Sequence, residues 1–161
     1  MPITTIGYEG LRLSEFIEML SDAGIHTVID VRELPLSRKK GFSKKALAKE
    51  LAENNIEYVH MRRLGCPKSI RHDYRDDKDW DRYTVRYMAY LNTQEDAMGE
   101  LSEFVAYDKK CCLLCFEENA YECHRSLVTQ SLKAFWLPNL KINHLRTDQI
   151  MTPAEAETMP L

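Results

Sequence analysis

The sequence predicts a single three-layer α/β domain, with a mostly parallel sheet of about five strands covered by helices. Short β-prone runs alternate with helical patterns in the order βαβαβ(αα)βαβ, which is typical of a parallel sheet. The run 111–116 is apolar throughout, as in a strand that is covered on both faces. The chain has 161 residues, of which 44% are hydrophobic, and this is enough for the core of one globular domain.

The first elements predict a βαβ unit. A strand over 3–8 precedes an amphipathic helix, which Ser14 is placed to cap and Gly24 to end. A second strand follows over 26–31. A strand, a helix and a parallel strand within about thirty residues form a unit whose crossover is right-handed.

The middle of the chain adds a long loop, a helix and a third strand. The loop over 33–41 carries Pro, Gly and three consecutive basic residues, and Ser43 then caps a helix. The third strand spans 56–61. From 66 to 79 the chain is polar and rich in both charges, and we interpret this segment as an insertion over the strand ends. A strong helical stripe begins at Trp80, more typical of core than of a binding platform.

The last third completes the sheet. A helix with inward positions between 97 and 105 leads to the strand over 111–116, and a fifth strand follows over 141–145. We expect one domain over 1–147 and a polar tail over 148–161 that frays. The strand order stays open, because the third connection is long enough to place the fourth strand on either side.

Composition restricts the classes of protein. The net charge of −3 argues against a surface coated in basic charge, although a local basic groove remains compatible with it. No apolar run approaches membrane-spanning length, and the N-terminus lacks a signal-peptide core. The five cysteines are odd in number and lie mostly in apolar segments, so reduced thiols in the cytoplasm are expected. The oligomeric state is left open.

A helix begins close to the end of the strand over 111–116. Cys123, His124 and Arg125 fall in its first turn, where unpaired backbone N–H groups and the helix dipole favour an anion. The forked guanidinium of Arg125 suits a phosphate or a carboxylate. This arrangement predicts an anion site at the carboxyl end of a strand.

Other candidates lie at strand ends, where ligands bind in open α/β sheets. The candidate catalytic residues are Glu9, Asp30, Cys115, Glu117, Cys123 and His124, and the candidate substrate-binding residues are Tyr8, Arg32, Arg38 and Arg125. Structural alternatives stand beside these roles. Asp30 and Arg32 would form a buried ion pair, Glu9 would cap the following helix, and His124 would be a buried core histidine. Glu117 is a candidate general base if apolar neighbours raise its pKa.

The cysteines allow two interpretations. Cys112 and Cys115, followed by Cys123 and His124, superficially match a zinc spacing. However, Cys112 and Cys115 point to opposite faces of a strand, and we expect the adjacent Cys123 and His124 not to converge on one ion. No metal and no cofactor are therefore predicted. Cys115 and Cys123 lie near a helix N-terminus and an arginine, which favours a nucleophilic thiolate, whereas Cys111 and Cys112 are expected to be inert.

One dense basic cluster lies in and after the loop over 33–41, and consists of Arg38, Lys39, Lys40, Lys44 and Lys45. Its commonest explanation is a solvated charge run. Alternatively, the cluster and Arg125 follow a phosphate backbone while a tyrosine or Phe42 stacks on bases.

Several of these segments together resemble the DUF488 family. They are Thr5-Ile6-Gly7-Tyr8-Glu9-Gly10, Ile29-Asp30-Val31-Arg32 with Pro35 and Ser37, Gly41-Phe42-Ser43, Leu64-Gly65, and Cys115-Phe116-Glu117 with Cys123-His124-Arg125, from near the N-terminus to about residue 145. The resemblance implies one α/β domain whose strand-end residues form one site, and it supplies no reaction. A weaker likeness is to rhodanese and related cysteine-loop domains, but nine residues separate Cys115 from Arg125, too many for a tight cradle.

Three hypotheses of function follow. The first is a hydrolase or transferase acting on a phosphate-bearing substrate, either a nucleotide or a nucleic acid. In it Arg125 and Arg32 hold the anion, and Glu117, Glu9 or Asp30 provides acid–base catalysis. The second is rhodanese-like thiol chemistry through one of the two cysteines near the helix start. The third is a non-catalytic nucleic-acid-binding module built on the basic loop.

Overall fold

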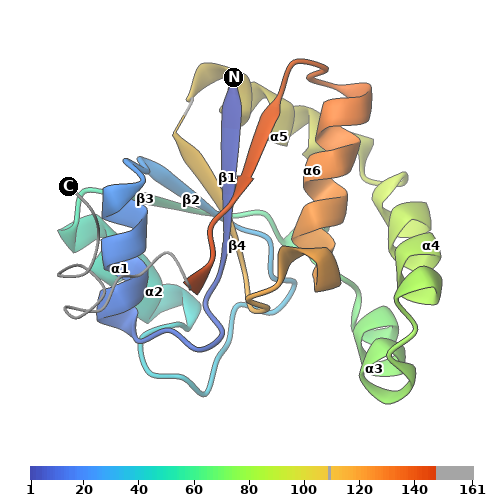
Figure 1. Ribbon diagram of the computed structural model, residues 1–161, viewed down its shortest axis with the longest axis horizontal. Helices are drawn as coiled ribbons and strands as arrows, with labels where there is room; N and C mark the ends of the chain where they lie inside the picture. The colour runs from blue at the N-terminus through green and yellow to red at the C-terminus, as the bar shows by residue number, and fades with distance from the viewer. Residues whose placement is uncertain (109, 148–161) are drawn as a thin grey trace, which may run out of the picture.

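The sheet of the protein, seen in a computed structural model that describes residues 1–108 and 110–147, is parallel throughout (Figure 1). Its five strands lie in the order β3-β2-β4-β1-β5. The strands are β1 (Pro2–Gly7), β2 (Thr27–Asp30), β3 (Glu57–His60), β4 (Cys111–Cys115) and β5 (Lys141–His144). The tail expected over 148–161 lies outside the described residues.

Helices cover both faces of this sheet, which confirms the predicted three-layer α/β fold (Figure 1). The α-helices are α1 (Leu13–Asp22), α2 (Lys44–Glu53), α3 (Lys68–Asp77), α4 (Trp80–Leu91), α5 (Glu95–Tyr107) and α6 (His124–Phe135), and the 3₁₀ turns are η1 (Arg62–Leu64) and η2 (Ala120–Glu122). One face packs against α1 and α2, and the other packs against α4, α5 and α6. Within residues 1–108 and 110–147, no helix has the length and apolarity needed to cross a membrane.

Strand β4 shows why its sequence is apolar without alternation. It lies in the middle of the sheet, between β2 and β1, and all five of its residues are buried. Cys112 and Leu114 belong to the core under α1 and α2, whereas Cys111, Leu113 and Cys115 belong to the opposite core. The predicted separation of Cys112 and Cys115 on opposite faces is therefore confirmed, as the pleat of a strand requires.

Two local predictions need correction. Ser14 is not the N-cap of α1, because the helix begins at Leu13 after Arg12, whose backbone N–H donates to the Glu15 carboxylate at 2.9 Å. Gly24 does follow the helix end, with the positive φ of 69° that favours glycine. The polar segment over 66–79 contains helix α3, which the sequence interpretation did not include. It buries Ile70 and leaves most other side chains to solvent.

The order of the strands creates a crevice between β1 and β4. From β1 the chain passes to α1 on one face of the sheet, whereas from β4 it passes to α6 on the other face. The loops that follow these two neighbouring strands therefore diverge, which opens space at their carboxyl ends. In open α/β sheets such a switch point is where ligands bind.

Candidate functional site

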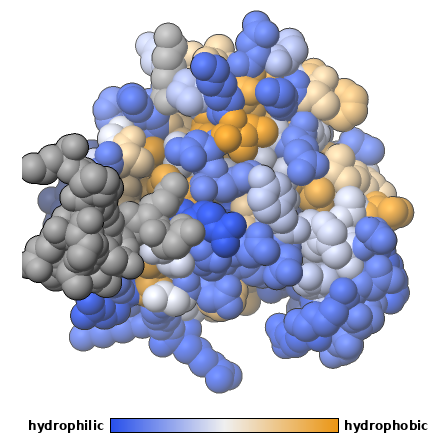
Figure 2. All heavy atoms as spheres, in the orientation of Figure 1, coloured by the Kyte–Doolittle hydropathy of each residue, from blue (hydrophilic) through white to orange (hydrophobic). Residues whose placement is uncertain are grey.

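A cavity of about 760 Å³ opens at the carboxyl ends of the strands. Its walls come from the loops after β1, β2 and β4, from the start of α6, and from α3. Figure 1 shows α3 standing apart from the body of the domain beside these loops. Figure 2 shows a notch in the surface there, with α3 coloured as hydrophilic. The cavity thus lies at the switch point.

Three side chains that bear sulfur or nitrogen converge beside this cavity, and we call them the thiol–imidazole cluster: Cys115, Cys123 and His124. The Nδ1 atom of His124 lies 3.6 Å from Cys115 Sγ and 3.8 Å from Cys123 Sγ. Cys115 and His124 also line the cavity. Glu117 lines it as well, with its Oε2 3.5 Å from Cys115 Sγ.

The convergence of Cys123 and His124 contradicts the expectation that adjacent residues would diverge at this helix start. Cys123 is the N-cap of α6 and has an extended backbone, with φ −137° and ψ 144°, whereas His124 is the first helical residue. The change of backbone conformation between them turns both side chains toward the end of β4. The expectation that Cys123 and His124 do not converge is therefore wrong.

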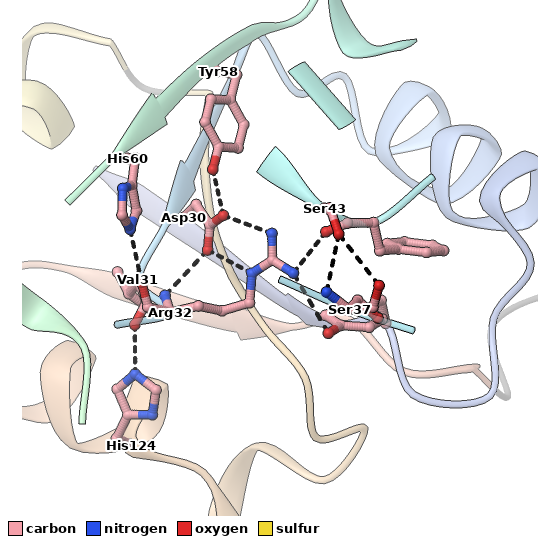
Figure 3. A network of polar contacts seen from close by, with 10 residues as sticks. Asp30, Val31, Arg32, Ser37, Ser43, Tyr58, His60 and His124 are labelled. Carbon is pink, nitrogen blue, oxygen red and sulfur yellow. Dashed lines mark hydrogen bonds and ion pairs between the residues drawn. The ribbon is translucent and has the colours of Figure 1, made fainter. Parts of the chain in front are cut away.

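The backbone of β2 fixes the orientation of the His124 ring. Its Nε2 atom lies 2.7 Å from the carbonyl oxygen of Val31 (Figure 3). A carbonyl oxygen only accepts, so Nε2 must carry the proton. In the neutral ring, the lone pair of Nδ1 therefore points at the two sulfur atoms. His124 is buried, as the core interpretation expected, but it also faces the cavity.

The cluster shifts the acidity of its own members. Burial raises the pKa of Glu117 to about 7, and a charged Cys123 nearby adds to the rise. The hydrogen bond to Cys123, together with burial, raises the pKa of Cys115. Burial opposes ionisation of Cys123, but the hydrogen bond from Cys115 and the proximity of His124 hold its pKa well below the ordinary value. Negative charge in the cluster therefore resides on Cys123 first, not on the thiol that faces the cavity.

Arg125 lies beneath this loop and does not line the cavity. Its side chain is completely buried, and its Nε donates to Thr5 Oγ1 at 3.0 Å. Its Nη1 and Nη2 donate to the backbone carbonyls of Glu117 and Glu118. These bonds replace the predicted anion-binding role with a structural one: Arg125 ties the loop after β4 to strand β1.

Gly7 allows the same loop to pass directly over β1. An added Cβ at Gly7 would lie 1.7 Å from the carbonyl oxygen of Glu117 and 3.0 Å from Nη1 of Arg125. Both obstacles are held in place, since one is backbone and the other is a buried guanidinium. Only glycine is compatible with this close approach.

Gly7→Ala is therefore expected to destabilise the fold by roughly 1–3 kcal/mol, the usual cost of overpacking, and to displace Glu117. The matched control is Gly99→Ala within α5, where the new Cβ would meet only Trp136 at 3.4 Å. The control is expected to stabilise by up to about 1 kcal/mol through helix propensity. Urea denaturation of both variants measures the difference, and equal stabilities would contradict the close approach.

Asp30 and Arg32 form a buried ion pair at the end of β2, which was the structural alternative for them (Figure 3). Arg32 donates to both carboxylate oxygens of Asp30, at 2.9 and 2.8 Å, and to the Phe42 carbonyl at 2.7 Å. Tyr58 donates to the same carboxylate. Asp30 is fully buried and away from the cavity, which corrects its predicted catalytic role, whereas Arg32 lines one wall.

The remaining predicted residues divide into two groups. Tyr8 and Glu9 line the cavity, and Glu9 accepts a bond from the Glu118 backbone rather than capping α1. Arg38 is exposed and does not line it. Phe42 is fully buried and stacks on Tyr8 with ring centroids 4.6 Å apart, so it is not available to stack on a base.

Sequence reasoning missed the wall that α3 provides. Arg71, Tyr74 and Arg75 of this helix line the cavity, and so does Lys78, the residue that directly follows the helix. They recur at positions i, i+3, i+4 and i+7, the spacing of one helical face, and this signal was present in the sequence. Arg71 pairs with Glu33 at 3.2 Å. Within the described part of the chain, Arg75 and Lys78 have no carboxylate partner.

The fold and the site define a class: a three-layer α/β protein with a thiol–imidazole cluster and a carboxylate at the switch point of its sheet. The family model described as "Domain of unknown function DUF488" matches residues 12–132, and the chain belongs to this family. The match begins after β1, so the segment Thr5-Ile6-Gly7-Tyr8-Glu9-Gly10 lies outside it. Comparisons with curated proteins and with solved structures found no match.

Proposed function

We propose that the protein is an enzyme, a hydrolase or transferase, that acts on a phosphate-bearing substrate in the cavity. One observation carries the proposal: a single cavity has on one wall two cations, Arg75 and Lys78, that lack a carboxylate partner among the described residues, and it also exposes Cys115, Glu117 and His124. Arg75 and Lys78 replace Arg125 as the groups that hold the anion. The reacting part of the substrate would then face Glu117 and the cluster.

The exposure of the two cations and the fixed position of Glu117 both favour this arrangement. Arg75 and Lys78 are exposed on α3 and project into the cavity rim, where charge attracts a phosphate before desolvation begins. Glu117 lies in the loop that Arg125 holds, so its position is fixed by the fold. A carboxyl group in fixed position beside a bound substrate is suited to general acid–base catalysis.

The binding half of the proposal predicts an effect confined to α3. In thermal-shift measurements with inorganic phosphate, nucleotides and short RNA or DNA, a ligand at a hundred times its Kd should stabilise the wild type by about 2.7 kcal/mol. The double variant Arg75→Ala/Lys78→Ala should lose this shift, whereas Arg38→Ala/Lys40→Ala on the basic loop should keep it. If the loop variant loses binding and the α3 variant keeps it, the non-catalytic nucleic-acid module replaces this proposal.

The catalytic half concerns Glu117. For the ligand that the shifts select, Glu117→Gln should retain binding and lose turnover by roughly 10²–10⁴-fold, the usual contribution of general acid–base catalysis. Glu103→Gln makes the same change of charge on the exposed side of α5 and should leave turnover unchanged. Product chromatography provides the readout. Equal rates in the two variants would remove Glu117 from the reaction.

The second candidate is thiol chemistry, favoured by the Cys115–His124 contact of 3.6 Å at the cavity floor. Cys115, the imidazole of His124 and the Val31 carbonyl that orients this imidazole form a chain of contacts, as nucleophile, base and orienting group do in thiol enzymes. Because burial and the bond to Cys123 raise the pKa of Cys115, His124 would have to take the thiol proton when the substrate is bound. Thiol chemistry predicts a covalent adduct of substrate on Cys115, detectable by mass spectrometry of quenched reactions. Turnover without an adduct, and with Cys115→Ser still active, would exclude it.

A further inference from the structure

We infer that the thiol–imidazole cluster is a zinc site, with Cys115 Sγ, Cys123 Sγ and His124 Nδ1 as its protein ligands and the cavity side as its open position. These three ligand atoms lie within 4.8 Å of one another. Two thiolates and an imidazole are a donor set that favours Zn²⁺ over the oxygen-binding cations Mg²⁺ and Ca²⁺. The inference rests on the geometry of the cluster, and its place in catalysis rests on the proposed function.

The distances from His124 Nδ1 to the two sulfur atoms match the edges of a tetrahedron around zinc. Bond lengths of about 2.3 Å to sulfur and about 2.1 Å to nitrogen place tetrahedral S and N ligands about 3.6 Å apart. The two S–N distances in the cluster are 3.6 and 3.8 Å. A cation can therefore bind His124 Nδ1 together with either sulfur atom at ordinary bond lengths.

The orientation of His124 is also that of a metal ligand. Its Nε2–H donates to the Val31 carbonyl at 2.7 Å, which holds the ring and leaves Nδ1 free to coordinate (Figure 3). Zinc-bound histidines almost always make such an outer bond. A central cation would contact all three ligand atoms of the cluster at once.

The surroundings provide a path to the metal and a fourth ligand. Cys115 and His124 line the cavity, so a cation can reach them from solvent. Glu117 Oε2 lies 3.5 Å from Cys115 Sγ, close to the tetrahedral edge for an oxygen ligand. A water from the cavity would take the fourth position, beside Glu117. A site with three protein ligands and one open position is typical of catalytic rather than structural zinc.

Metal content tests the inference independently of any enzymatic activity. The full chain is stripped with a chelator and titrated with Zn²⁺ against a competing indicator, with Mg²⁺ as the control cation. The wild type should bind about one equivalent of zinc, and Cys123→Ser should weaken binding by more than about 100-fold, since even an outer partner of a ligand contributes 10–100-fold. Cys66→Ser removes a thiol that lines the same cavity outside the cluster and should bind as the wild type does.

Two measurements on the wild type test the zinc site even if the Cys123 variant fails to fold. Cobalt in place of zinc should give tetrahedral ligand-field bands and thiolate-to-cobalt charge transfer. Zinc should also lower the rate at which iodoacetamide labels Cys123. Absence of zinc binding, or retention of full affinity in Cys123→Ser, would overturn the site. Neither result would affect the Arg75/Lys78 and Glu117 tests, so the metal site and the proposed function can fail separately.

Discussion

Arg125→Met is expected to lower the free energy of unfolding by roughly 3–5 kcal/mol, because it leaves buried acceptors without a donor. The guanidinium is completely buried and serves the Thr5 hydroxyl and the carbonyls of Glu117 and Glu118. Because methionine fills a similar volume, the loss of stability reports mainly on the hydrogen bonds of Arg125 and less on its packing. The free loop should also release Glu117 from its place in the cavity.

Urea denaturation gives the size of this effect from the midpoint and the slope of the transition. Arg38→Met is the matched control, since Arg38 is exposed and surface substitutions usually change stability by less than about 0.5 kcal/mol. Arg125→Lys should fall between the two, because one ammonium group does not reproduce the planar fork of a guanidinium. Equal stability of the two methionine variants would show that Arg125 does not hold the loop.

Asp30→Ala should cost about 3–5 kcal/mol, the usual penalty for leaving one member of a buried ion pair uncompensated. The Asp30 carboxylate is fully buried and accepts bonds from Arg32 and from the Tyr58 hydroxyl. The pairing also favours the charged form of Arg32: although burial opposes its charge, the bonds to Asp30 raise its pKa. Without Asp30 the guanidinium would keep only the carbonyl of Phe42 and the weak contact with Tyr8.

A double-mutant cycle separates the ion pair from its surroundings. Replacing both partners, as Asp30→Ala/Arg32→Met, removes the buried charge together with its counter-charge, so the double variant should be more stable than Asp30→Ala alone. Chemical denaturation of the four proteins gives the coupling free energy. Additive effects of the two substitutions would mean that the pair contributes no interaction of its own.

Local patterns were enough to predict the layers of the fold. The apolar run of β4 and the stripe of α4 carry their own signals, since a strand covered on both faces needs apolar residues throughout and a core-facing helix needs them at a period of 3.6 residues. The location of the site also followed from the sequence, because parallel strands present their carboxyl ends at one edge. Cys115, Glu117 and His124 line the cavity at that edge, and their roles in a reaction stay predictions.

The roles of individual side chains required three dimensions. Arg125 reads as an anion-binding residue from its position at a helix start, but the crossing of the β4 loop over Gly7 places backbone carbonyls around it. The contribution of α3 to the cavity was not predicted for a different reason. Its polar side chains resemble those of a loop, although their spacing is helical.

The sequence by itself determined the α/β class, the parallel sheet and the gathering of polar residues at its carboxyl edge, because these depend on periodicity and on chain direction. Only the tertiary structure decided the strand order, the burial of Arg125 and the convergence of Cys123 and His124. Convergence depends on the extended backbone at one N-cap and on a carbonyl of a neighbouring strand that orients the ring. Such contacts join residues far apart in the chain, and no local pattern encodes them.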